Sequence, residues 1–63
     1  MTEEDQCALA LLSMAISLAL TEAALKAWGR EHTALIDAQP DAVFHPFRAA
    51  YADRLAVLKE TER

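Results

Sequence analysis

The segment Cys7–Leu20 (CALALLSMAISLAL) constrains the fold more than any other part of this 63-residue chain, because only Ser13 and Ser17 interrupt its apolar side chains. Alanine, leucine and methionine favour a helix, and a helix that is apolar nearly all round must be covered on several sides. A chain of this length, residues 1–63, forms one small domain whose core is marginal as a monomer. We therefore expect a further surface to cover part of this segment.

Composition disfavours several classes of protein. The apolar run is shorter than the roughly 20 residues of a transmembrane helix, and acidic residues stand where a secretory signal has its basic region. A membrane helix is therefore only a minor alternative, and a cytoplasmic location is expected. The net charge of −4 disfavours nucleic acid as a partner. Cys7 is the only cysteine, which excludes an internal disulfide and fits a reducing compartment.

The sequence predicts an all-α fold with two helices. Thr2 suits an N-cap, and the three acidic residues after it suit a first helical turn. The apolar positions keep one register across Gly29, which predicts a long helix over about 3–38, although glycine also suits a helix C-terminus. The sequence leaves that continuity open. Pro46 is predicted at the first position of a second helix, over about 46–60.

These two helices are expected to pack as an antiparallel hairpin. At 1.5 Å per residue the first would be about 54 Å long and the second about 24 Å. Folded back from a turn near residue 39, the second helix would cover the first only as far as about Glu22. The predicted core of the hairpin consists of Leu25, Trp28, Leu35, Phe47, Tyr51, Leu55 and Leu58.

Cys7–Leu20 would then extend beyond the hairpin, and an exposed apolar patch of this kind marks an interface. The simplest closed arrangement is a homodimer in which the N-terminal halves pack antiparallel, giving a four-helix bundle. The sequence leaves open whether a second copy or a different protein covers the segment. The predicted interface residues are Leu9, Leu11, Leu12, Met14, Ile16, Leu18 and Leu20.

No pattern in the sequence points to an enzyme, a metal site or a cofactor. His32 and His45 are the only histidines, and they lack the spacing of metal ligands. Gly29 is the only glycine, so there is no glycine-rich phosphate loop, and no nucleophile has an evident base and orienting group. We expect no catalytic residue, metal or cofactor. His32, on a leucine row of the first helix, and Phe44, in the predicted loop, are candidate contacts with a partner.

The stretch Leu25–Lys59 resembles a helical segment of some phage-encoded recombination and single-strand-annealing proteins. It shares the apolar-Lys-Ala-Trp start, the isoleucine before an Ala-x-Pro turn, and Ala-Ala-Tyr followed by an arginine-rich helix. The resemblance implies a phage or mobile-element setting. It carries over no DNA-binding residue.

The sequence therefore predicts a small, non-enzymatic protein-interaction module of a phage or bacterium. Such a module would act as an inhibitor, adaptor or assembly factor, self-associating through Cys7–Leu20 and binding a protein partner of unknown identity. The alternative function is a nucleic-acid-associated accessory factor of a phage or mobile element.

Overall fold

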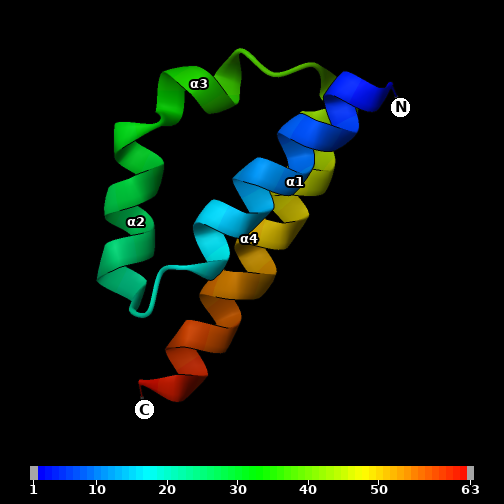
Figure 1. Cartoon of the computed structure of the whole chain (residues 1–63). Coiled ribbons are helices and arrows are strands. Elements are labelled where there is room, and N and C mark those ends of the chain that lie inside the picture. The colour runs from blue at the N-terminus through cyan, green and yellow to red at the C-terminus, as the bar shows by residue number, and fades with distance from the viewer. Residues whose placement is uncertain (1, 63) are drawn as a thin grey trace.

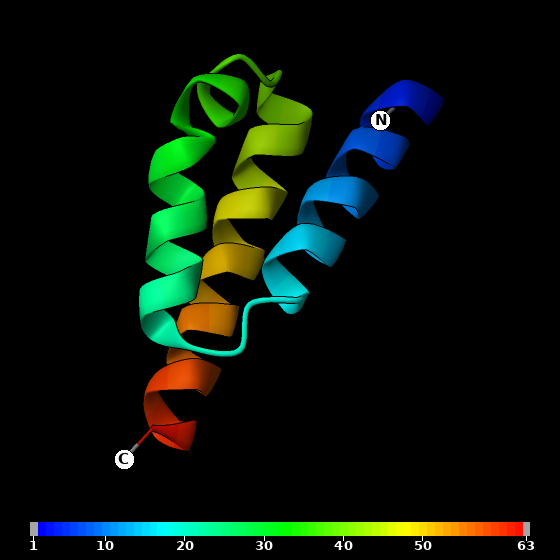
Figure 2. The same cartoon turned by 60° about the vertical axis from the view of Figure 1, so that its left-hand side comes forward.

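The computed structural model describes residues 2–62, which form four helices. These are α1 (Glu3–Ser17), α2 (Glu22–Glu31), α3 (Thr33–Asp37) and α4 (Asp41–Thr61). Helices α1 and α4 lie side by side and run in the same direction, whereas α2 returns in the opposite direction (Figures 1 and 2). The prediction of an all-α protein is confirmed.

The predicted continuous helix over 3–38 is wrong, because the chain reverses between Leu18 and Thr21. Thr21 is extended (φ −135°, ψ 157°), and its hydroxyl accepts a hydrogen bond of 3.0 Å from the amide of Ala24. A side-chain oxygen in this position satisfies one of the free amides at the start of a helix. Thr21 is therefore the N-cap of α2, as Thr2 is the N-cap of α1.

Gly29 does not end a helix. It lies inside α2, and its φ is not positive, so the helix passes through it. A Cβ at this position would lie 3.3 Å from Oη of Tyr51. The absence of a side chain at Gly29 thus lets the Tyr51 ring of α4 approach α2 closely.

Helix α4 begins at Asp41, so the predicted start at Pro46 is also wrong. A proline inside a helix cannot donate a hydrogen bond to the carbonyl four residues earlier, here that of Ala42. Both Ala42 and Pro46 are exposed, which leaves that carbonyl accessible to water. The opposite face of the same turns carries Val43 and Phe47, which are buried, and their burial holds the helix together across the proline.

The core lies mainly between α1 and α4, with α2 closing one side. Its buried residues are Leu12, Ile16, Leu25, Val43, Phe47 and Leu58. The C-terminal helix therefore does reach Cys7–Leu20, and the predicted two-helix hairpin is wrong. The length argument failed because the reversal after α1 lays the apolar segment beside α4.

Arg54, in the C-terminal half of α4, and Glu62, directly after it, hold this reversal in place. One guanidinium nitrogen of Arg54, Nη2, donates to the carbonyl oxygens of Ala19 (2.6 Å) and Ser17 (3.2 Å). The carboxylate of Glu62 accepts a hydrogen bond of 3.1 Å from the amide of Glu22. Arg54 thus satisfies carbonyls at the end of α1, and Glu62 satisfies an amide at the start of α2.

Candidate functional site

Helix α1 has two apolar faces, and α4 covers only one of them. Leu12 and Ile16 lie on the covered face. A second row is exposed, with 67% of Leu11, 62% of Met14 and 77% of Leu18 accessible to solvent, and Cys7 is exposed in line with them. The successive spacings of four, three and four residues align these side chains along one edge of the helix, as at a coiled-coil seam. We call Cys7, Leu11, Met14 and Leu18 the α1 stripe.

The predicted interface residues fall into three groups. Leu12 and Ile16 are covered by the chain itself, and Leu9 is half-buried against the same core. The exposed members are Leu11, Met14, Leu18 and Leu20, the last of which is 78% exposed in the α1–α2 connection.

The α1 stripe is acidic at one end only. Glu3, Glu4 and Asp5 form the first turn of α1, and the helix contains no basic residue. The far end of the stripe, at Leu18, carries no charged side chain of α1. If two such stripes pack together, the repulsion between their acidic ends therefore depends on whether the two helices run parallel or antiparallel.

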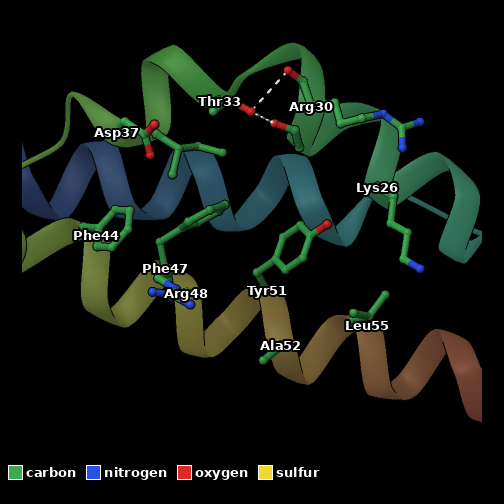
Figure 3. Close-up of a pocket in the computed structure, with 12 residues that line it drawn as sticks. Lys26, Arg30, Thr33, Asp37, Phe44, Phe47, Arg48, Tyr51, Ala52 and Leu55 are labelled. Carbon is green, nitrogen blue, oxygen red and sulfur yellow. Dashed lines mark hydrogen bonds between the residues drawn. The ribbon is translucent and has the colours of Figure 1, made fainter.

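A second surface is a groove of about 540 Å³ between α2–α3 and α4 (Figure 3). Its apolar floor comes largely from one face of α4. The charged rim comes from both sides, with Lys26 and Arg30 on α2 and Arg48 on α4. We call this the α2–α4 groove. Its floor residues on α4 are Phe44, Phe47, Tyr51 and Leu55.

The α2–α4 groove is electropositive although the chain as a whole is acidic. Of the five Lys and Arg side chains in residues 2–62, three line it, whereas Asp37 is the only one of the ten acidic residues that does. Beside the groove, the Lys26 ammonium lies 2.9 Å from the Glu22 carboxylate. The hydrogen bond from Lys26 lowers the pKa of Glu22 and outweighs the opposing effect of desolvation.

Sequence reasoning missed this groove, because Arg48 is far from Lys26 and Arg30 in the sequence and the three come together only when α2 packs beside α4. The i,i+4 spacing of Lys26 and Arg30 was the one available signal, and it placed both on one face of a helix.

The two candidate partner contacts have different surroundings. Nδ1 of His32 lies 2.8 Å from the carbonyl oxygen of Trp28, and the two rings stack with centroids 4.6 Å apart. His32 is thus engaged within its own chain, at the joint between α2 and α3. Phe44 is half-buried in the α2–α4 groove, where the Arg48 guanidinium carbon lies 5.7 Å from its ring centroid.

The predicted hairpin-core residues differ in how deeply they are buried. Leu25, Phe47 and Leu58 are buried in the core. Leu35 is 49% exposed on α3. Three others are half-buried and pack against the core, namely Trp28, Tyr51 and Leu55.

Within residues 2–62, no three His, Cys, Asp or Glu side chains gather to hold a metal ion. No helix in this part of the chain combines the length and apolarity needed to cross a membrane. No protein-family model, curated protein or solved structure matches the sequence or fold significantly.

Proposed function

We propose that the protein is a non-enzymatic interaction module that self-associates through the α1 stripe. The observation that carries this proposal is the exposure of Leu11, Met14 and Leu18 in one row on a folded chain. Burying such side chains contributes about 1.5–3 kcal/mol each, so a surface that covers the row gains substantial free energy. A second copy offers the same row, and a two-fold dimer buries both rows in one closed contact.

We propose an antiparallel arrangement of the two α1 helices. A parallel pair would bring two copies of the acidic first turn (Glu3, Glu4 and Asp5) together, whereas an antiparallel pair separates them and opposes the two helix dipoles. In an antiparallel seam, layers form where the residue numbers of the two chains have a constant sum. The α1 stripe then pairs Cys7 with Leu18 of the other copy, and Leu11 with Met14.

This contact is confined to one helix per chain, so it lies at the small end of protein interfaces. We therefore expect a reversible dimer with a dissociation constant on the order of micromolar. A dimer of this strength assembles according to local concentration, which suits an adaptor or assembly factor.

Sedimentation equilibrium from about 1 to 200 µM tests the proposal around the expected dissociation constant. We expect a monomer–dimer equilibrium for the natural chain and a folded monomer for Leu11→Lys, because a lysine at this exposed position charges the seam without entering the core. Leu35→Lys is the matched control, since it makes the same change at an exposed leucine of α3, and it should still dimerise. A natural chain that stays monomeric throughout, or a Leu11→Lys variant that dimerises equally well, would refute self-association through the stripe.

Cysteine crosslinking tests the orientation. Cys7 is exposed on the stripe, and a disulfide requires Cα atoms about 4.4–6.8 Å apart. The antiparallel pairing predicts that Leu18→Cys yields covalent dimers through Cys7 and the new cysteine on mild oxidation, whereas the natural chain yields few. Efficient Cys7–Cys7 crosslinking in the natural chain would instead establish a parallel pair.

A second candidate, a nucleic-acid-associated accessory factor, rests on the three cations that line the α2–α4 groove beside aromatic side chains. Aromatic rings and cations together are the usual means of binding single strands, but nine of the ten acidic residues lie outside the groove and would repel the phosphates there. Binding of a single-stranded oligonucleotide that weakens steeply with salt supports this candidate. No binding at low salt excludes it.

A further inference from the structure

We propose that the α2–α4 groove binds an acidic amphipathic helix of a partner protein. This site is separate from the α1 stripe, and the proposal does not depend on self-association. The shape of the groove, its floor and its charge each point to such a ligand.

The groove lies on the face of the α2–α4 pair that α1 leaves uncovered. In Figure 3 the α1 ribbon passes behind the groove, between α2–α3 and α4, and the floor side chains of α4 extend toward α2–α3 in front of it. A helix laid along the front would occupy a place equivalent to that of α1 and complete a four-helix arrangement. Helices pack in such grooves at axial distances of about 8–10 Å.

The apolar floor is long and narrow. It extends along α4 from Phe44 to Leu55, a rise of about 16 Å, or three helical turns. The ring centroids of Phe47 and Tyr51 are 6.3 Å apart, and Phe44 and Leu55 extend the apolar floor at its two ends. A ligand of matching length presents apolar side chains on successive turns, which is the pattern of an amphipathic helix docked in a groove.

The charges on the rim select an acidic ligand. Arg30 stands on one side of the floor and Arg48 on the other, so acidic residues on both flanks of a docked helix would meet a cation. Lys26, also on the α2 side, is already paired with Glu22. Asp37 lines the α3 end of the groove, and it would repel an acidic residue of the ligand at that end only.

The test uses the Leu11→Lys variant, which keeps self-association out of the measurement, so that failure of either proposal can be recognised separately. The probe is a fluorescent peptide of about 15 residues, long enough to form a helix, with leucine on one face and glutamate on both flanks. A second peptide has lysine at every glutamate position. Fluorescence anisotropy should show at least tenfold tighter binding of the glutamate peptide, and this preference should shrink as salt is added.

Charge removal on the rim should weaken binding without unfolding the protein. We expect Arg30→Gln and Arg48→Gln each to lower the affinity about threefold to fivefold, the range for exposed ion pairs. Lys59→Gln is the matched control, because this exposed cation of α4 lies outside the groove, and it should change the affinity by less than about twofold. Circular dichroism and the melting temperature report that each variant is folded.

Three results would overturn the proposal. The first is that the glutamate peptide fails to bind at millimolar concentration, or binds no better than the lysine peptide. Alternatively, a short oligothymidine would bind more tightly and displace the peptide, which would assign the groove to nucleic acid. Finally, in titrations of the natural chain instead of the Leu11→Lys variant, the fraction of bound peptide would fall as the chain dimerises, which would assign the groove to a second copy.

Discussion

Replacing Arg54 by methionine tests the main departure of the fold from a continuous helix, namely the reversal after α1. The Arg54 guanidinium donates to the carbonyls of Ala19 and Ser17 and so links α4 to the end of α1. Methionine retains an unbranched apolar stem that packs along the same surface. The substitution therefore removes the hydrogen bonds with little loss of packing.

The two hydrogen bonds set the expected magnitude. A hydrogen bond from a charged donor contributes about 1.5–3 kcal/mol. The 2.6 Å bond to Ala19 is partly buried and belongs in this range, whereas the 3.2 Å bond to Ser17 is exposed to competing water and contributes less. Nε of Arg54 is buried without a partner in residues 2–62, and removing that unsatisfied group offsets part of the loss. We expect Arg54→Met to lower the free energy of unfolding by about 2 kcal/mol.

For a chain of this size a loss of 2 kcal/mol lowers the melting temperature by about 8–16 °C. Urea unfolding followed by circular dichroism measures the effect, at one protein concentration and in the Leu11→Lys background, because dimerisation would otherwise shift the apparent stability. Arg48→Met is the control, an exposed arginine on the same helix whose contact with Phe44 contributes about 0.5–1 kcal/mol. If Arg54→Met costs no more than Arg48→Met, the hydrogen bonds to Ala19 and Ser17 do not hold the reversal.

Three further predictions follow from single contacts. Ile16→Asp should unfold the chain, at a cost of more than about 4 kcal/mol, because Ile16 is only 3% exposed; a variant that merely dissociates but keeps its circular dichroism would contradict its place in the core. Gly29→Ala should raise the free energy of unfolding by about 0.5 kcal/mol, since the gain in helix propensity is offset by displacing Oη of Tyr51, and the gain should be larger in a Tyr51→Phe background. The lowered pKa of Glu22 predicts a small stabilisation that is present above the ordinary value of 4.5 and lost as the pH falls through the lowered value; melting curves against pH should lose this component in Glu22→Gln.

The start of α2 was predictable from the sequence. Thr21-Glu22 repeats the Thr2-Glu3 pair, which correctly predicts the start of the first helix. The threonine hydroxyl caps α2 as it caps α1, whereas the single register of apolar positions across Gly29 favours one continuous helix. That register survives across the break only as a numerical pattern, because the residues on either side belong to helices that run in opposite directions.

The start of α4 was harder to predict, because local rules and tertiary packing disagree there. Pro46 is a legitimate first residue of a helix, and the sequence alone does not show that Val43, one turn earlier, is completely buried. Burial of Val43 and Phe47 on one face keeps the backbone helical through the proline. The α2–α4 groove depends on the same outcome, since Phe44 belongs to its floor only because that turn is helical.

The fold also explains why an apolar segment that is partly covered by its own chain still supports an interaction surface. Helix α4 buries the face of α1 that contains Leu12 and Ile16, and the 4-3-4 row of the α1 stripe lies on a different side of the helix. One contact cannot cover both faces of an apolar helix. Folding therefore reduces the candidate interface from the whole of Cys7–Leu20 to the exposed α1 stripe. Because α1 lies behind the α2–α4 groove (Figure 3), dimerisation through the stripe would leave both grooves open. A dimer would then offer two sites to a partner, and two linked partner helices would bind it more tightly than one.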